Sequence, residues 1–164
     1  MQSPRVVKGF DITPIRTWFD EQIKTCEWHI NPKGPGRRMA FFNKAPLYNE
    51  LFDVFSLKSL ALEPKFKIFI GNNFQDGAFV HEHQDDNLNS LIHARINVMV
   101  KKPPKGGNPT LGGQEIQVNE GDIWLCISGK EMHGSKPISG GERYIVSYGG
   151  LFLEEDLMPW INNL

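Results

Sequence analysis

The chain has 164 residues, a length that fits one domain with a buried core and is too short for two independent domains. Its 18 basic and 19 acidic residues leave a net charge of −1, which argues against a protein whose main role is to bind a phosphate backbone. The cysteines Cys26 and Cys126 lie far apart, so we expect reduced thiols and no disulfide framework. The N-terminus lacks an apolar signal core and no apolar run approaches the roughly 18 residues of a membrane span, which predicts a cytoplasmic protein.

The first 60 residues carry mainly helical periodicity. A Thr-Pro start followed by apolar residues at helical spacing predicts a helix from Thr13 to about Trp28. A loop rich in proline and glycine, Asn31–Gly36, separates this helix from a short strand at Met39–Phe42. A second helix is predicted from Pro46 to about Leu57. We expect both helices to pack on the outside of a sheet.

From Phe66 onward the pattern changes to short β-rich runs separated by glycine and proline turns. The candidate strands are Phe66–Ile70, Ala78–His83, Ala94–Val100, Gln114–Val118, Asp122–Cys126 and Arg143–Gly149. Many short strands with such punctuation favour a sandwich or jelly roll. We therefore expect a single domain that is mainly β with flanking helices. Residues 1–60 form its helical support, residues 61–153 its β core and residues 154–164 a C-terminal tail.

An H-x-D motif and a later histidine form a candidate metal site in the β core. His83 and Asp85 lie on the same face of their strand, roughly 6–7 Å apart at the backbone, so both side chains can reach one ion. His133 follows a later strand, in a loop with glycine and serine that can return it to the same place. Two imidazoles and one carboxylate are the ligand set with which proteins hold non-heme Fe(II) while leaving open positions. The sequence therefore predicts a metal site at these residues.

Arg143 is the candidate residue for binding a small carboxylate near that metal. It begins the last predicted strand, and Ser147 lies on the same face. A guanidinium offers a planar fork of donors that matches a carboxylate, and a hydroxyl adds a further hydrogen bond. The pair is suited to a dicarboxylate that lies between the strands.

Residues 66–153 resemble the double-stranded β-helix core of the Fe(II)- and 2-oxoglutarate-dependent dioxygenases, and look most like their compact prolyl-hydroxylase branch. The resemblance rests on His83-Gln84-Asp85, on the segments HARINVMVKKPPKGG and VNEGDIWLC, and on HGSKPISGGERYIVS with its distal histidine and arginine. It implies a double-stranded β-helix, or jelly roll, that holds Fe(II) at His83, Asp85 and His133. It also implies that Arg143 binds the distal carboxylate of 2-oxoglutarate.

The resemblance carries further expectations about the co-substrate and the reaction. Ser147, Asn72 and Asn97 would contact 2-oxoglutarate. Met99 stands where several prolyl hydroxylases have a tyrosine that helps to hold it, so another group must supply that contact. The implied enzyme consumes O2 and 2-oxoglutarate, releases succinate and CO2, and hydroxylates a small molecule or a peptide side chain. Asp85 favours hydroxylation, because the halogenating members of the family lack this carboxylate.

A cupin-type metal-binding enzyme or binding protein is the main alternative. It would use His81, His83 and His133 as ligands. However, the glutamate expected a few residues after the histidine pair is missing, since Asn87 stands there. A cupin also gives no reason for Arg143. The oxygenase is therefore the better interpretation.

Partners other than a small molecule or a peptide are less favoured. Arg37, Arg38 and the Lys101–Lys105 stretch concentrate positive charge and are suited to touch phosphates, as a nucleic-acid demethylase would need. The near-zero net charge makes nucleic acid an unfavoured partner. We expect no membrane association.

Overall fold

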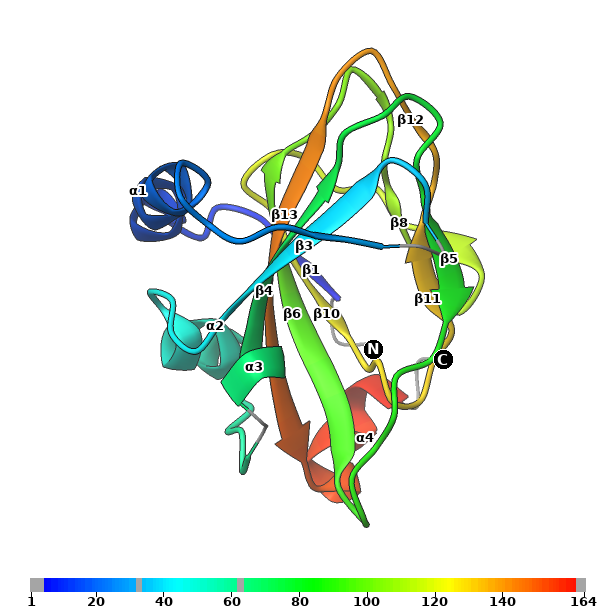
Figure 1. Cartoon of the computed structure of the whole chain (residues 1–164). Coiled ribbons are helices and arrows are strands. Elements are labelled where there is room, and N and C mark those ends of the chain that lie inside the picture. The colour runs from blue at the N-terminus through cyan, green and yellow to red at the C-terminus, as the bar shows by residue number, and fades with distance from the viewer. Residues whose placement is uncertain (1–4, 32–33, 62–63, 162–164) are drawn as a thin grey trace.

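The structure is a computed structural model that describes residues 5–31, 34–61 and 64–161. A seven-stranded and a four-stranded antiparallel sheet face each other (Figure 1). The major sheet runs β1 (Val6–Val7), β10 (Ile123–Cys126), β6 (Ile92–Lys101), β13 (Arg143–Phe152), β4 (Ile68–Asn73), β3 (Arg37–Phe42) and β2 (His29–Ile30). The minor sheet runs β5 (Val80–His83), β11 (His133–Ser135), β8 (Pro109–Leu111) and β9 (Gln114–Glu115). A further pair joins β12 (Ile138–Ser139) to β7 (Lys105–Gly106), and the whole is a double-stranded β-helix, as predicted.

The long strands of the major sheet are buried on both faces, and their side chains alternate between two environments. On β13, Tyr144, Val146 and Tyr148 belong to the core beneath the helices. Arg143 and Ser147 point the other way, into a cavity between the sheets. The outer face therefore supplies stability, and the inner face supplies the site.

Helices cover the outer face of the major sheet (Figure 1). α1 (Thr13–Gln22) buries Phe19 edge-on against Tyr144, with ring centroids 5.1 Å apart. α2 (Tyr48–Val54) buries Phe52 against Phe152 at 5.3 Å. Pro14 fits the first turn of α1, where its missing N–H is not needed. These contacts confirm that the two predicted helices pack outside the sheet.

Several element boundaries differ from those predicted, including those of α2 (Tyr48–Val54) and β5 (Val80–His83), which are shorter than expected. α1 ends at Gln22 and not near Trp28, because the N–H groups of Lys24 and Thr25 bond to carbonyls three residues back and tighten the chain into turns. Phe66 lies in a short helix, α3 (Pro64–Lys67), so the strand predicted from Phe66 begins at Ile68. The strand predicted at Gln114–Val118 is reduced to β9, which covers its first two residues.

Described segments near both ends of the chain, β1 and α4, pack against the core. β1 and β3 extend the major sheet, so residues 1–60 supply strands as well as helices. α4 (Glu154–Ile161) occupies the C-terminal tail and buries Leu157 and Trp160. Among the described residues, no helix is long and apolar enough to cross a membrane.

Candidate active site

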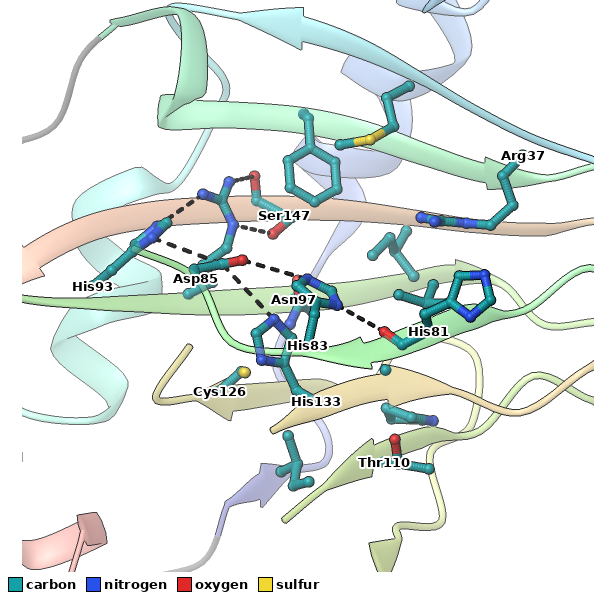
Figure 2. A pocket seen from close by; sticks show the side chains of 18 of the residues that line it. Arg37, His81, His83, Asp85, His93, Asn97, Thr110, Cys126, His133 and Ser147 are labelled. Atoms are coloured by element: carbon teal, nitrogen blue, oxygen red, sulfur yellow. Dashed lines mark hydrogen bonds and ion pairs between the residues drawn. The ribbon is translucent and has the colours of Figure 1, made fainter. Parts of the chain in front are cut away.

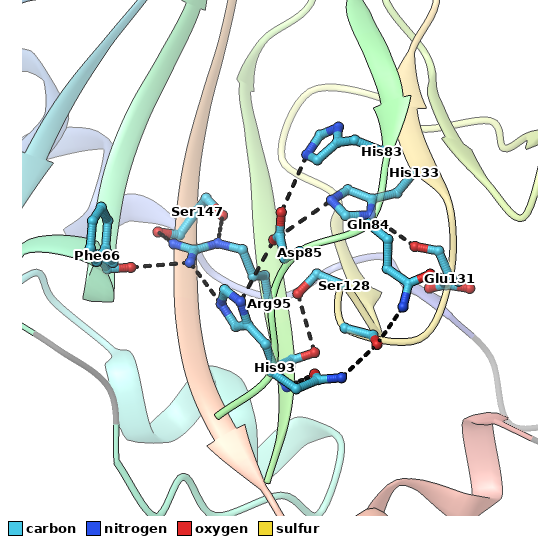
Figure 3. Close-up of polar contacts among 12 residues, drawn as sticks. Phe66, His83, Gln84, Asp85, His93, Arg95, Ser128, Glu131, His133 and Ser147 are labelled. Atoms are coloured by element: carbon cyan, nitrogen blue, oxygen red, sulfur yellow. Dashed lines mark hydrogen bonds and ion pairs between the residues drawn. The ribbon is translucent and has the colours of Figure 1, made fainter. Parts of the chain in front are cut away.

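His83, Asp85 and His133 converge at one edge of the minor sheet, as the sequence predicts. The two histidines lie directly opposite each other on β5 and β11, with ring centroids 4.3 Å apart. Asp85 follows β5, where its N–H bonds to the carbonyl of Ser128. One ligand atom from each of the three side chains lies within 4.8 Å of the other two (Figure 3). Of all groups of histidine, cysteine and acidic side chains in the described part of the chain, this one alone has the spacing of a metal site.

The separations within this cluster suit a single metal ion. His83 Nε2 is 3.3 Å from Asp85 Oδ1, and His133 Nε2 is 3.7 Å from Asp85 Oδ2. Two neighbouring ligands that each lie about 2.1 Å from an ion are roughly 3 Å apart. Small side-chain rotations therefore bring all three groups to coordination distance, on one side of the ion.

The second nitrogen of each histidine is held by a backbone carbonyl. His83 Nδ1 lies 2.7 Å from the oxygen of His81, and His133 Nδ1 lies 3.0 Å from the oxygen of Glu131. A carbonyl only accepts hydrogen bonds, so Nδ1 of each ring carries a proton, and Nε2 is the nitrogen that becomes free to bind a metal when the ring is neutral. This is the usual way in which proteins orient metal-binding histidines. His81 thus contributes its backbone, while its ring packs against Phe79 at 4.7 Å.

The electrostatics of the cluster favour a carboxylate beside neutral imidazoles. Burial alone would raise the pKa of Asp85, but the hydrogen bond from His83 and the positive potential of the surrounding histidines lower it to about 2. The hydrogen bond to Asp85 raises the pKa of His83, and burial lowers the pKa of His133. At neutral pH Asp85 is ionised and His133 is neutral, which leaves a carboxylate and a free imidazole nitrogen, both of which suit a metal cation.

A second pair of residues, His93 and Arg95, lies behind Asp85 and was not predicted from the sequence. His93 Nδ1 is 3.7 Å from Asp85 Oδ2, and its Nε2 is 3.1 Å from the guanidinium of Arg95 (Figure 3). Arg95 also donates to the hydroxyl and carbonyl oxygens of Ser147 and to the carbonyl of Phe66. Burial and the positive charge of Arg95 lower the pKa of His93 to about 4, and burial lowers that of Arg95 to about 10. The signal in the sequence is that both are polar residues at alternate positions in the apolar run of β6.

The cluster opens into a cavity of about 680 Å³ between the two sheets (Figure 2). The middle of the cavity is apolar and is lined by Leu111, Trp124 and Ile145, which belong to a small separate core. Ser147 on β13 and Asn97 on β6 lie opposite each other, and both line the cavity. The hydroxyl of Ser147 accepts a hydrogen bond from Arg95.

The other end of the cavity is cationic. Arg143 is 3% exposed, and its Nε donates to the carbonyl of Gly107 at 2.8 Å. Burial and the nearby charge of Arg37 lower the pKa of Arg143 to about 9. No acidic side chain among the described residues forms an ion pair with Arg143. Thr110 also lines the cavity, and its buried hydroxyl has no hydrogen-bond partner among the described residues. The arrangement leaves donors that suit an anion.

Asn72 lies outside this cavity, contrary to its expected contact with a co-substrate. It stands opposite Arg38 and Tyr144 across the sheet, where its oxygen accepts from Arg38 at 2.8 Å and its nitrogen donates to the carbonyl of Arg143. Strand alternation turns its neighbour, Asn73, to the inner face, opposite Arg37 and Arg143. A shift of one residue along a strand exchanges the two faces, and the sequence alone does not show which asparagine faces inward.

No protein-family model and no curated protein matches the sequence. Solved structures similar to the chain include HygX of Streptomyces hygroscopicus with nickel, 2-oxoglutarate and hygromycin B bound (12% identity, TM-score 0.62, 90% of this chain and 82% of that chain). They also include the viral collagen prolyl hydroxylase of Paramecium Bursaria Chlorella virus-1 in its 2OG complex (14%, 0.66, 90% and 95%). A prolyl-4-hydroxylase of Pseudomonas putida is a third (15%, 0.56, 88% and 88%). The chain thus has the double-stranded β-helix fold of 2-oxoglutarate- and Fe(II)-dependent oxygenases.

Proposed function

We propose that this protein is an Fe(II)- and 2-oxoglutarate-dependent oxygenase that hydroxylates a small molecule or a peptide side chain. The observation that carries the proposal is the occurrence, in one cavity, of a His-Asp-His cluster and a buried arginine without an acidic partner among the described residues. In the overall reaction, one atom of O2 converts a substrate C–H into C–OH. The other atom enters succinate as 2-oxoglutarate loses CO2.

His83, Asp85 and His133 would hold Fe(II) on one side. When bound, Fe(II) supplies open coordination positions for 2-oxoglutarate and O2. The backbone carbonyls of His81 and Glu131 keep the ligand nitrogens aimed at the metal. The chain's own contribution is therefore a preset geometry in which no ligand has to change its tautomer.

Arg143 would orient the co-substrate through its distal carboxylate. Its Nε is held by Gly107, so its terminal N–H groups are left to form the forked pair that a carboxylate accepts. The hydroxyl of Thr110 is suited to supply the contact for which Met99 offers no polar group. Asn97, which lines the cavity, is a further candidate contact for the co-substrate. Ser147 has an indirect role, because its hydroxyl accepts a hydrogen bond from Arg95 and so fixes that guanidinium. The apolar side chains between Arg143 and the metal cluster exclude water.

The cupin alternative is less well supported by the geometry. The cluster includes the carboxylate of Asp85, and the ring of His81 is not part of it. A metal site of His81, His83 and His133 would have to leave out Asp85, whose carboxylate faces both His83 and His133.

Anaerobic titration with Fe(II) and 2-oxoglutarate tests the proposed function. We expect the weak visible charge-transfer band of the chelate in the wild-type protein, and no band in Asp85→Ala or His133→Ala. Arg143→Ala should need much more 2-oxoglutarate to reach the same band. Asp86→Ala and His29→Ala are matched controls, because both residues are exposed and lie outside the cluster. Absence of the band in the wild type, or its persistence in Asp85→Ala, would contradict the proposal.

A further inference from the structure

The side chains that strand β3 turns toward the cavity change from charged to apolar along the strand. Alternation places Arg37, Met39 and Phe41 on the inner face, and all three line the cavity. Arg37 lies at the buried end, 9% exposed, whereas Phe41 is 37% exposed. The strand therefore runs from a cation inside the cavity to an aromatic ring at its more exposed end.

Arg37 is a buried cation without an acidic partner in the described part of the chain. Its Nε donates to Asn73 Oδ1 at 3.1 Å, and that bond turns the amide nitrogen of Asn73 away from it. The Asn73 nitrogen is buried and has no hydrogen-bond partner among the described residues. Asp86 also borders the cavity, but its side chain is exposed and forms no ion pair with Arg37. In Figure 2 the guanidinium of Arg37 points toward the space beside His81 and His83. Arg37 thus lines the cavity as a cation unpaired among the described side chains, and Asn73, which lies outside the lining, holds its Nε in place.

The charge balance of the site leaves Arg37 uncompensated. Under the proposed function, Asp85 and the 2-oxoglutarate dianion together carry less negative charge than Fe(II) and the three arginines that line the cavity carry positive charge; these arginines are Arg37, Arg95 and Arg143. Two positive charges then remain in a region from which water is largely excluded. An unpaired buried charge is costly, so the occupied site favours a further anion. The remaining ligand of such a site is the substrate.

The middle and outer parts of the same wall are apolar. Phe41 lies 6.4 Å from Phe69 and 6.1 Å from Phe66, ring centroid to ring centroid, in edge-to-face arrangements. Met39 lines the cavity between Arg37 and Phe41. Rings in such arrangements can accept a flat or aliphatic group against their faces.

From these features we infer the class of the substrate: a small organic acid whose carboxylate binds Arg37, with an apolar body along Met39 and Phe41. The inference rests on the proposed function, because it assigns Arg143 to the co-substrate and Arg37 to the substrate. It makes Arg37 a specificity-determining residue supplied by the N-terminal part of the chain.

Calorimetric titration of a matched pair of probes tests this inference. The probes are hydrocinnamate, a carboxylate with a phenyl body, and its neutral amide, hydrocinnamide. Both are titrated into protein saturated with Mn(II) and 2-oxoglutarate, so that the Arg143 end is already occupied. We expect hydrocinnamate to bind roughly tenfold or more tightly than the amide, as charge-assisted hydrogen bonds predict.

Variants assign that preference to one arginine. Arg37→Gln should abolish the preference for the carboxylate, and Arg37→Lys should retain part of it. Both should leave the Kd of 2-oxoglutarate within about threefold of the wild-type value, since the distal carboxylate pairs with Arg143. Arg38→Gln is the matched control, because Arg38 lies on the opposite face of β3, stacked on Trp28 at 4.1 Å.

Three results would overturn the inference. The first is the absence of any preference for the carboxylate in the wild type, and the second is an unchanged preference in Arg37→Gln. The third is a loss of 2-oxoglutarate affinity in Arg37→Gln as large as in Arg143→Gln, which would assign both arginines to the co-substrate. Failure of the proposed function gives a different pattern. In that case 2-oxoglutarate does not bind with Mn(II), while an Arg37-dependent preference for the carboxylate persists without it.

Discussion

At the scale of single residues, the two histidines of the cluster are prepared in the same way. Each places Nδ1 against the carbonyl of the residue two positions earlier, His81 for His83 and Glu131 for His133. The local backbone therefore sets the tautomer, and the ligand nitrogen faces Asp85 without help from a distant residue. The rings differ in exposure: the side chain of His83 is 46% exposed and that of His133 is 15% exposed.

This difference predicts how metal affinity depends on pH. A metal displaces protons from its ligands, so affinity falls where a ligand is protonated. The pKa of His83 is raised from 6.5, that of His133 is lowered, and Asp85, at about 2, is already ionised. Just below pH 6.5, His83 is therefore the main proton-bound ligand. Mn(II) affinity should fall by about tenfold per pH unit there and level off as pH rises through the His83 pKa.

Calorimetry in two buffers of different ionisation enthalpy measures the protons released on Mn(II) binding. Near pH 6 we expect a release close to one proton, and a smaller release near pH 8. A release of two protons near pH 6 would show that His133 is protonated as well, and no release at either pH would show that His83 is not a ligand.

The residues of the site that the sequence indicated are those whose spacing within one strand carries the signal. His83 and Asp85 share a face because they are two positions apart, and Arg143 and Ser147 share one because they are four apart. Arg37, Asn73 and Thr110 could not be predicted in this way. Arg37 and Asn73 meet Arg143 through the register of separate strands, and Thr110 reaches the cavity from the minor sheet. The linear pattern contains neither arrangement.

At the scale of elements, the pairing of β5 with β11 brings the two histidines together. His133 is opposite His83, and the register shifts between His133 and Ser135. Gly134 lies at this irregularity, and a Cβ there would meet the carbonyl oxygen of Val80 at 2.5 Å. Glycine thus permits the close approach of two strands beside the metal ligands.

Gly134→Ala should separate β11 from β5 and weaken the metal site. The added methyl contacts backbone and cannot be relieved by a side-chain rotation, so His133 must move relative to His83. We expect Mn(II) affinity to fall by about tenfold or more, since misplaced ligands lose coordination energy. Calorimetric titration measures the affinity, and circular dichroism checks that the variant is folded.

Gly113→Ala is the control for this prediction. It lies in the turn between β8 and β9, where a Cβ would meet nothing within 4 Å, although φ is +80°. The strained backbone should lower stability by about 1 kcal/mol. Metal affinity should be unchanged, and equal losses of affinity in both variants would show that Gly134 acts only through stability.

The elements with long runs were predictable, and the short ones were not. β6 and β13, each of ten residues, cover the strands predicted for them. β6 extends beyond both ends of its predicted strand, and β13 extends beyond the C-terminal end. β8, β11 and β12 have two or three residues, too few for an alternating pattern to appear. β8 and β11 belong to the minor sheet, and β12 pairs with β7. Because β11 is too short to be recognised in the sequence, His133 was expected in a loop, whereas it lies on this strand.

At the scale of the whole molecule, the two faces of the major sheet have separate tasks. The outer face, with α1 and α2, holds the larger apolar core, and the inner face holds the smaller core and the polar site. Buried arginines and asparagines on the inner face are costly to desolvate, so stability must come mainly from the outer face. Changes on the two faces should therefore be separable.

Phe52→Ala tests this separation. Phe52 is 1% exposed and packs between Tyr48 and Phe152. Its loss should lower the free energy of unfolding by about 3–5 kcal/mol, through lost burial and the cavity that remains. Denaturant unfolding measures the loss, and Mn(II) titration of the folded variant should give the wild-type affinity. A marked loss of affinity in folded Phe52→Ala would show that the faces are coupled.

Metal binding should in turn stabilise the whole fold, because His133 lies far from His83 and Asp85 in the sequence and meets them only in the native state. A ligand that binds only the native state at about 100 times its Kd adds about 2.7 kcal/mol. For a domain of this size, that corresponds to a rise in Tm of roughly 5–10 °C. Differential scanning calorimetry with Mn(II), against the same protein in chelator, measures the rise. Asp85→Ala should show little of it, because one of three ligands is gone, whereas Asp86→Ala should keep it. An equal rise in Asp85→Ala would place the stabilising ion elsewhere in the molecule and remove the main support for the metal centre.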